Sequence, residues 1–295
     1  MEALKKPPWL KKRIPPIQEI EKVKAILGRG NLHTVCEEAR CPNLGDCFSK
    51  GTATFLILGR VCTRDCGFCA VEHGTPFPLN ASEPETVARA VTELKLQYVV
   101  LTSVTRDDLQ DGGASHYAEA IRAIRTLDPG VKIEVLIPDL KGDPTALETI
   151  LKEQPDVLNH NVETVPRLYP QVRPQADYRR SLELLKRAKE IGSSLLTKSG
   201  FMLGLGEIQE EVLDLLADLR GVRCDFLTIG QYLQPRSDRL PVVRYVLPEE
   251  FEDYRRIAQE LGFKGVASGP FVRSSFHASQ MFENGTHKQD EAANT

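Results

Sequence analysis

Six of the seven cysteines in this 295-residue chain lie in two short groups of three. The first triad is Cys36, Cys41 and Cys47, and the second triad is Cys62, Cys66 and Cys69. Three thiolates can bind three irons of a four-iron cluster and leave the fourth iron without a protein ligand. Ferredoxins bind their clusters with four cysteines, whereas a catalytic cluster needs an open iron. The chain is therefore expected to hold two clusters, each with a fourth ligand from elsewhere.

The composition is that of one large domain, with or without extensions, that folds in water. The chain is 41% hydrophobic and 27% charged, and its net charge of -3 gives no basic field for nucleic acid. No apolar run approaches the ~20 residues that cross a membrane, so we expect a cytoplasmic protein without a membrane partner. Clustered cysteines in a reducing compartment indicate metal or catalytic sites, and a secreted disulfide protein is the alternative.

Strands and helices alternate from about residue 51 onward. The predicted strands cover residues 53–58, 98–102, 131–137, 156–161, 194–203 and 226–231. The predicted helices cover residues 16–27, 116–127, 144–152, 178–191, 208–219 and 248–261, with one more that starts in a capping box at Ser82. About six such units predict an α/β fold with a parallel sheet, and both a βα barrel and a doubly wound sheet fit them.

The chain divides into three expected segments. Residues 1–50 form an N-terminal extension that carries the first triad in a loop. Residues 51–268 form the strand–helix body, and residues 269–295 form a C-terminal segment with a disordered tail from residue 284. Polar residues follow several predicted strands, at 102–103, 159–163 and 198–200. Parallel α/β folds concentrate function at this edge of the sheet.

The spacing of the cysteines resembles that of a known superfamily. The second triad reads C-x3-C-x2-C with Phe68 before the last cysteine, which resembles the signature of the radical S-adenosylmethionine superfamily. The C-x4-C-x5-C spacing of the first triad and the stretch Arg273-Ser-Ser-Phe276 are similar to the lipoyl synthase family. The likeness covers about residues 7–280. It implies a partial (β/α)6 TIM-like barrel with N- and C-terminal extensions.

Two positions depart from the family pattern. Phe276 stands where the family usually has Tyr, and Phe48 stands where it commonly has Trp. Both keep an aromatic ring, so we expect packing to change rather than metal ligation. A hydrogen bond from the Tyr hydroxyl would be lost at Phe276.

The resemblance implies that the second triad binds a catalytic 4Fe-4S cluster. The open iron would be chelated by the amino and carboxylate groups of S-adenosylmethionine, and reductive cleavage would release a 5′-deoxyadenosyl radical. The alternative is a zinc site, in which His73 would supply the fourth ligand.

The resemblance also implies an auxiliary 4Fe-4S cluster on the first triad, with Ser275 as the fourth ligand. An alkoxide oxygen binds this iron less well than a thiolate does, which suits a cluster that gives up sulfide. From the residues alone, Ser274 and Ser275 would only cap a local turn, and His33 could complete a zinc site instead.

Further residues are nominated by their position after strands and by the resemblance. The expected contacts to S-adenosylmethionine are Thr102, Ser103, Asn161, Glu163, Arg173 and Lys198. Each of them could instead be an ordinary loop or cap residue. Cys224, the seventh cysteine, is expected to be a structural thiol.

The implied reaction inserts two sulfur atoms at carbons 6 and 8 of a protein-bound octanoyl-lysine, with the auxiliary cluster as sulfur donor. The implied partners are an octanoylated lipoyl carrier, either a 2-oxoacid dehydrogenase subunit or the glycine cleavage H protein, and an electron donor such as flavodoxin or ferredoxin. The basic residues from Lys5 to Arg13 could contact an acidic carrier. An enzyme of this superfamily whose auxiliary cluster transfers electrons, a zinc-binding interaction module and a plain electron carrier are the alternatives.

Overall fold

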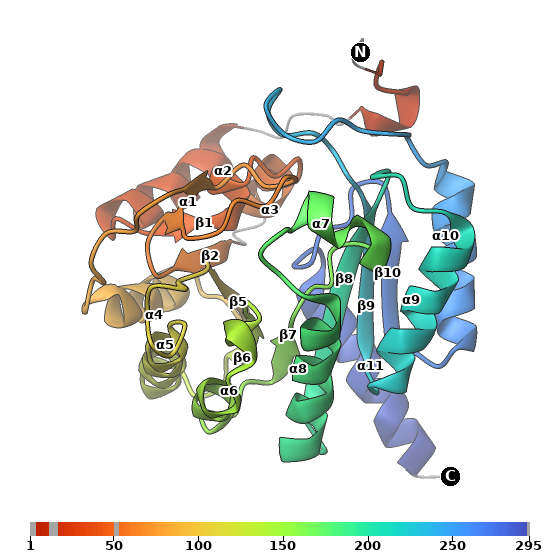
Figure 1. Cartoon of the computed structure of the whole chain (residues 1–295). Coiled ribbons are helices and arrows are strands. Elements are labelled where there is room, and N and C mark those ends of the chain that lie inside the picture. The colour runs from red at the N-terminus through yellow and green to blue at the C-terminus, as the bar shows by residue number, and fades with distance from the viewer. Residues whose placement is uncertain (1–3, 12–16, 50–52, 294–295) are drawn as a thin grey trace. The chain divides into compact units, whose positions relative to one another are not determined.

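The computed structural model describes residues 4–11, 17–49 and 53–293. The chain forms two compact units, shown in Figure 1. Unit 1 consists of Met1–Lys11 and Asn159–Thr295, and unit 2 consists of Lys12–Leu158. Lys12 and Arg13, which belong to the predicted basic start, lie outside the described residues. No helix in the described part of the chain is both long enough and apolar enough to cross a membrane.

Unit 2 begins with short elements that carry the first triad. They are α1 (Ile17–Arg29), β1 (His33–Thr34), α2 (Val35–Glu38) and α3 (Leu44–Ser49). The prediction of a loop here was wrong, because Cys36 lies in α2 and Cys47 lies in α3. Thr34 caps α2 by accepting a hydrogen bond from the backbone nitrogen of Glu37 at 3.3 Å.

Parallel strands and their crossover helices make up the rest of unit 2. The strands are β2 (Thr54–Ile57), β5 (Tyr98–Ser103), β6 (Lys132–Leu136) and β7 (Val157–Asn159), neighbours in that order, and β1 pairs antiparallel with β2. The helices are α4 (Glu83–Glu93), α5 (Ala114–Leu127) and α6 (Pro144–Leu151), with the 3-10 turn Leu140–Gly142 before α6. A small parallel pair, β3 (Val61–Cys62) and β4 (Glu72–His73), frames the second triad. Helix α4 starts after Ser82 as predicted, but the Ser82 side chain makes no capping hydrogen bond.

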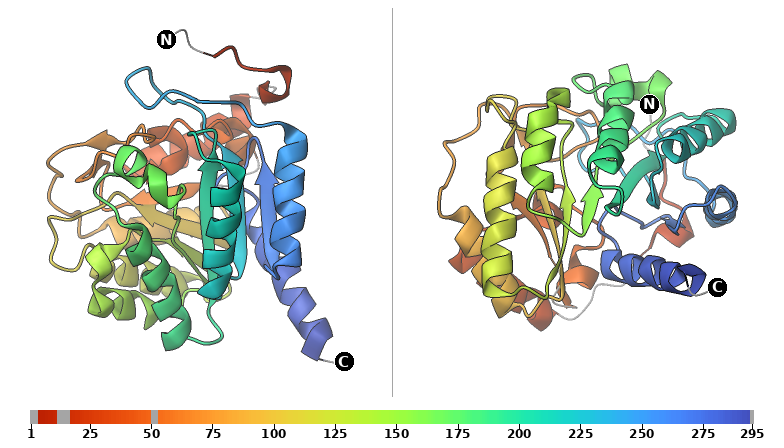
Figure 2. Two further views of the ribbon diagram at one scale, coloured as in Figure 1. Left: turned by 45° about the vertical axis from the view of Figure 1, so that its right-hand side comes forward. Right: turned by 90° about the horizontal axis from the view of Figure 1, so that it is seen from below.

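Unit 1 continues the alternation with β8, β9 and β10, which are parallel neighbours in that order. The strands are β8 (Leu196–Leu203), β9 (Phe226–Gln231) and β10 (Gly265–Gly269). The helices are α7 (Tyr169–Val172), α8 (Tyr178–Ile191), α9 (Gln209–Gly221), α10 (Pro248–Glu260) and α11 (Ala278–Ala293), with the 3-10 turns Pro8–Leu10 and Pro166–Leu168. Figure 2 shows α10 and α11 beside the last strand, and both contact β10.

Most predicted elements are present with ends shifted by a few residues. The strand β10 was missed because only one of its five residues, Val266, is β-branched. The disordered tail was also predicted wrongly, since α11 runs to Ala293. Its Ala, Gln and Glu residues favour a helix.

Candidate functional site

The second triad lies in a loop that begins at β3 and whose thiol Cys62 is held by backbone donors. The sulfur of Cys62 accepts hydrogen bonds from the backbone nitrogens of Arg64 at 3.4 Å and Thr105 at 3.3 Å. The chain then turns through a hydrogen bond from the nitrogen of Cys69 to the carbonyl of Cys66 at 3.1 Å. Backbone N–H groups aimed at a cysteine sulfur stabilise a thiolate ligand and tune the potential of its cluster.

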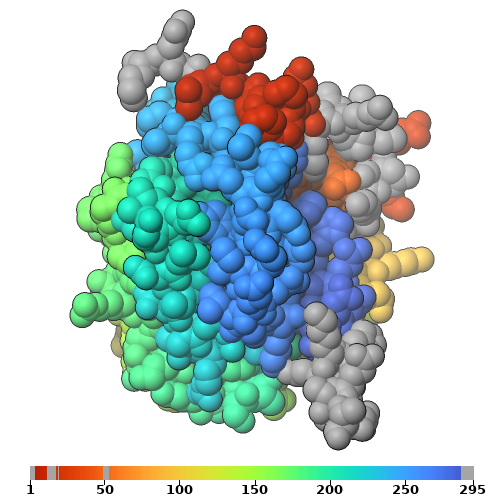
Figure 3. All heavy atoms as spheres, turned by 90° about the vertical axis from the view of Figure 1, so that its right-hand side faces the viewer, coloured from red at the N-terminus to blue at the C-terminus, as the bar shows by residue number. Residues whose placement is uncertain are grey.

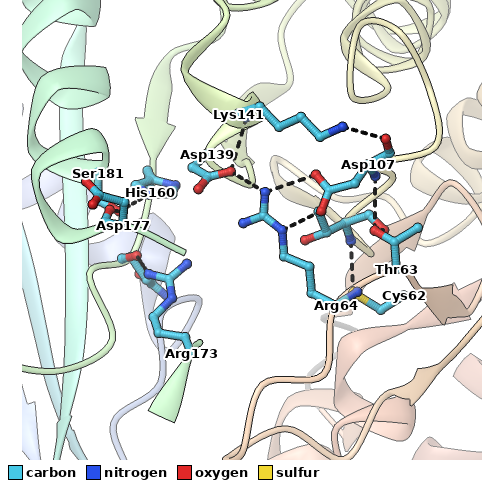
Figure 4. Close-up of polar contacts among 12 residues, drawn as sticks. Cys62, Thr63, Arg64, Asp107, Asp139, Lys141, His160, Arg173, Asp177 and Ser181 are labelled. Carbon is cyan, nitrogen blue, oxygen red and sulfur yellow. Dashed lines mark hydrogen bonds and ion pairs between the residues drawn. The ribbon is translucent and has the colours of Figure 1, made fainter. Parts of the chain in front are cut away.

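A buried guanidinium fixes the inside of this loop, as Figure 4 shows. Arg64 donates from Nε and Nη2 to the two carboxylate oxygens of Asp107, at 2.7 and 2.9 Å, and from Nη2 to Asp139 Oδ1 at 2.7 Å. Its side chain is only 4% exposed. Burial opposes the charge, but the bonds to the two carboxylates hold the pKa of Arg64 above its usual value. A bidentate pair of this kind restricts orientation as well as distance.

The segment after β5 is joined to the same loop by further hydrogen bonds. Thr63 donates from its backbone nitrogen and from Oγ1 to the carbonyl of Thr105, at 3.0 and 2.9 Å. Its hydroxyl accepts in turn from the backbone nitrogen of Asp107 at 3.0 Å. Lys141 donates from Nζ to the Asp107 carbonyl at 2.6 Å. The position of the second triad thus depends on the chain between Thr105 and Asp107.

Sequence reasoning missed this network. Arg64 lies inside the second triad, but no feature of the sequence assigned Asp107 to it. Asp139 lies 75 residues beyond Arg64 and carried no signal.

In the first triad Cys36 is buried, whereas Cys41 and Cys47 are partly exposed, as are the three cysteines of the second triad. Burial, together with the neighbouring thiols Cys41 and Cys47, raises the pKa of Cys36 to about 12. The backbone nitrogen of Asn43 donates to the Cys41 sulfur at 3.5 Å. A buried thiol such as Cys36 stays protonated at neutral pH until a metal displaces the proton. The suggested zinc ligand His33 has another neighbour, since its Nδ1 lies 3.3 Å from Glu38 Oε1.

The donor sets fit iron–sulfur clusters. All seven cysteines are free thiols. The described side chains include no group of three or more His, Cys, Asp or Glu gathered as ligands of one metal ion. Cluster cysteines do not need such a group, because each binds a different iron. His73 lies 3.4 Å from Asp65 through Nδ1.

Thr102 and Ser103 are the last two residues of β5, at the predicted edge. Thr102 donates from Oγ1 to the carbonyl of Leu136 at 3.0 Å. Ser103 Oγ is buried beside the hydroxyl of Tyr117, which also donates to the Leu136 carbonyl at 2.8 Å.

Asn161 and Glu163 lie together in unit 1, just beyond β7. Asn161 donates from Nδ2 to Glu163 Oε1 at 3.1 Å and to Ser274 Oγ at 2.5 Å. Asn161 Oδ1 is buried without a partner within the described ranges. Burial raises the pKa of Glu163, although Arg173 and Arg273 favour its charged form. The structure therefore brings the predicted Asn161 and Glu163 to the Arg-Ser-Ser stretch.

Arg173 and Lys198 are placed differently from each other. Arg173 donates from Nη1 to the carbonyl of Asn161 at 2.8 Å, and its guanidinium lies 5.4 Å from the centre of the Tyr169 ring. Lys198 was expected after a strand end, and this was wrong. It is the third residue of β8, opposite Phe226, and is 1% exposed. The reason is that β8 begins at Leu196 and continues five residues past Lys198.

Two further predicted residues have contrasting surroundings. Ser275 belongs to unit 1 and the first triad belongs to unit 2, so its ligation of an auxiliary cluster stays a prediction.

Cys224 is fully buried, donates to the Phe226 carbonyl at 3.3 Å, and has its pKa raised by burial to about 12. A thiol in this setting is inert, as predicted. His160, between two asparagines, contacts Ser181 Oγ at 3.0 Å through Nε2 (Figure 4).

Residues 56–219 match the radical SAM superfamily, and residues 1–41 match the N-terminal domain of lipoyl synthase of that family. A lipoyl synthase of Caldanaerobacter subterraneus subsp. tengcongensis is 55% identical over 276 residues, which cover 94% of this chain and 96% of the relative. A lipoyl synthase of Pelobacter propionicus is 57% identical over 281 residues, which cover 95% of this chain and 90% of that protein.

The fold resembles that of a solved enzyme of different sequence. The crystal structure of methylornithine synthase superposes with a TM-score of 0.53 over 77% of this chain and 67% of that one, at 15% identity. At an identity this low, the comparison supports a shared fold and nothing about function. The chain has the predicted α/β fold, a partial TIM-like barrel of mostly parallel strands.

Proposed function

Because the chain belongs to the lipoyl synthase family of the radical S-adenosylmethionine superfamily, we propose that it inserts sulfur at carbons 6 and 8 of a protein-bound octanoyl-lysine. It is a radical S-adenosylmethionine sulfurtransferase, with two 4Fe-4S clusters and S-adenosylmethionine as cofactors. The observation that carries the proposal is the pair of cysteine triads in a chain 55% identical to a lipoyl synthase.

The second triad would hold the catalytic cluster. When bound, this cluster supplies the electron that cleaves S-adenosylmethionine. Cys62, Cys66 and Cys69 are its proposed ligands. The protein's own contribution is to order the loop, through the Arg64 side chain and the donors to Cys62 Sγ. A loop that is already ordered loses less entropy when its ligands bind.

The first triad and Ser275 would hold the auxiliary cluster. Its three thiols include one that is almost fully buried, Cys36 at 3% exposure, so water has little access to that ligand. We propose that Ser275 supplies the weaker oxygen ligand, which would favour release of sulfide from this cluster.

S-adenosylmethionine would be bound through the predicted polar residues. Asn161 Oδ1, which has no partner among the described residues, can accept a hydrogen bond from its amino or hydroxyl groups, and Ser103 stays a proposed contact. Thr102, Glu163, Arg173 and Lys198 stay proposed contacts. The half-buried Glu163 carboxylate suits a ribose hydroxyl, whereas the cationic side chains suit the ligand carboxylate.

The substrate carrier would be an octanoylated lipoyl protein or domain, and the electron donor a flavodoxin or ferredoxin in the cytoplasm. The described N-terminal residues offer a basic surface for an acidic carrier. Lys5, Lys6 and Lys11 are exposed, and the segment is held to unit 1 where Tyr245 Oη donates to the Leu4 carbonyl at 3.4 Å. Figure 3 shows residues 4–11 in red against the blue chain before α10.

An anaerobic assay tests the proposed reaction. The protein is reconstituted with iron and sulfide and given dithionite, S-adenosylmethionine and an octanoyl-lysyl peptide, and products are followed by mass spectrometry. Lipoyl or 6-thio-octanoyl peptide together with 5′-deoxyadenosine is expected. 5′-Deoxyadenosine without sulfur in the peptide would favour an auxiliary cluster that transfers electrons. If protein with both clusters loaded forms neither product, the proposal is contradicted.

Two cysteine variants sharpen this assay. Cys41→Ala should lose about half of the bound iron and all sulfur insertion, yet still cleave S-adenosylmethionine. Cys224→Ala is the matched control, because this buried thiol lies outside both triads. It should keep both its iron and its product yield.

A further inference from the structure

The Arg-Ser-Ser stretch is seated closely on β9. The stretch turns through hydrogen bonds from the nitrogen of Val272 to the Gly269 carbonyl at 3.1 Å and from the nitrogen of Phe276 to the Arg273 carbonyl at 2.9 Å. A Cβ at Gly230 would lie 2.2 Å from the Val272 carbonyl oxygen. The absence of a side chain at Gly230 thus allows the turn to approach the strand.

Asn161 lies in a segment that is hydrogen-bonded to β8 and to Arg173. The chain after β7 runs along β8, with the nitrogen of Glu163 donating to the Gly200 carbonyl at 3.0 Å. Glu163 takes the left-handed conformation, with φ of 65°, which interrupts the regular strand here. The Asn161 carbonyl accepts from Arg173 Nη1 at 2.8 Å. The backbone around Asn161 is therefore held by β8 and by Arg173.

The amide of Asn161 joins two segments that are 113 residues apart. One Nδ2 hydrogen goes to Glu163 Oε1 at 3.1 Å and the other to Ser274 Oγ at 2.5 Å, so both donors are used. The Oδ1 acceptor has no partner within the described part of the chain, although the residue is only 8% exposed. A buried acceptor in this state is available for a ligand N–H or O–H group.

We propose that Ser274 is a positioning residue that couples binding of S-adenosylmethionine at Asn161 to the turn that presents Ser275. The inference rests on the proposed function. A ligand donor at Asn161 Oδ1 polarises the amide and strengthens its Nδ2–H bond to Ser274. Because coupling between two sites is reciprocal, removal of the Ser274 hydroxyl weakens binding of S-adenosylmethionine. Ser275, the neighbouring residue, is then held more firmly when the ligand is present.

The test measures the dissociation constant of S-adenosylmethionine by anaerobic equilibrium dialysis, on the full chain with both clusters loaded and without reductant. Ser274→Ala should raise the constant about fivefold, the effect of one ordinary hydrogen bond. Ser274→Thr keeps a hydroxyl and should restore binding. Ser279→Ala is the matched control. Its hydroxyl donates to the exposed Glu283 at 2.9 Å, away from Asn161 in sequence, and the variant should bind as the wild type does.

A double-mutant cycle separates coupling from a merely structural role. If Ser274 acts through Asn161, then Ser274→Ala should add little to the loss caused by Asn161→Ala. Additive losses would overturn the proposal, and so would a Ser274→Ala protein that binds S-adenosylmethionine as the Ser279→Ala protein does.

A measurement on the wild type covers the case in which the variants fold poorly. S-adenosylmethionine should slow amide hydrogen exchange in residues 269–276, and an unchanged exchange rate would overturn the coupling. The proposed reaction is tested separately from the coupling, by the sulfur content of the peptide product. Normal sulfur insertion with unaltered exchange would remove the coupling alone.

Discussion

At the residue scale, one charged side chain controls the geometry of the second triad. Arg64 stands between the proposed ligands Cys62 and Cys66 in sequence, and its guanidinium binds Asp107 and Asp139. Its role is to hold the loop that carries the thiols. Asp139 is fully buried, so loss of the guanidinium removes the cation opposite a buried carboxylate.

Arg64→Ala should therefore lower the free energy of unfolding by about 3 kcal/mol and reduce the iron retained by the second triad. Arg64→Lys should recover charge but not the bidentate geometry, and so should retain less iron than the wild type. Urea unfolding and iron analysis measure the two effects. Arg89→Lys, on the exposed face of α4, is the control. Equal iron content in the Arg64→Ala, Arg64→Lys and Arg89→Lys proteins would contradict the proposed role of Arg64.

At the element scale, two glycines in different elements test how closely the chain packs. Gly230→Ala places a Cβ 2.2 Å from the Val272 carbonyl oxygen, whereas Gly28 in α1 has nothing within 4 Å. Gly230→Ala should destabilise the protein and disturb the Arg-Ser-Ser turn. Gly28→Ala should raise the free energy of unfolding by up to about 1 kcal/mol, because Ala is the better helix former. Urea denaturation of both variants checks this, and similar shifts would refute the argument.

A second element-scale feature joins α8, β8 and the residue before β10 through Asp225. This carboxylate lies 2.8 Å from Lys189 Nζ and 2.9 Å from Lys264 Nζ and accepts from the Thr197 nitrogen at 2.9 Å. Burial acts to raise its pKa, but these donors hold the pKa of Asp225 below its usual value. Asp225→Ala should cost about 3–5 kcal/mol.

The pH dependence of this contribution follows from the lowered pKa. Its stabilisation is fully present above the unfolded pKa of about 3.9 and is lost as pH falls through the lower folded value. The difference in stability between wild type and Asp225→Asn should therefore be constant near neutral pH and shrink below about pH 4. Urea unfolding across that range measures it. A difference that grew on acidification would show the opposite sign.

At the scale of the whole molecule, the chain has a net charge of -3, but its N-terminal segment is basic. Charge reversal at Lys5, Lys6 and Lys11 should weaken binding of an octanoylated acidic carrier by about fivefold or more at low salt. The variant should also show a flatter salt dependence, since exposed charges are screened. Titration calorimetry at two ionic strengths measures both. Reversal of Lys186, an exposed lysine of α8, is the control, and equal losses in both proteins would remove the segment from the interface.

The sequence alone determined the residue types and the local periodicity. Cysteine spacing predicted two cluster sites on six thiols. Hydrophobic patterns identified the strands β2 and β5 to β9 and the longer helices other than α11, but not the short elements or β10. Both signals lie within a few neighbouring residues. Only the tertiary structure decided which distant side chains meet. Arg64 donates a hydrogen bond to Asp139, 75 residues away in sequence, and Asn161 donates one to Ser274, 113 residues away. Such pairs depend on strand register and on close approaches such as that at Gly230, which no local pattern specifies.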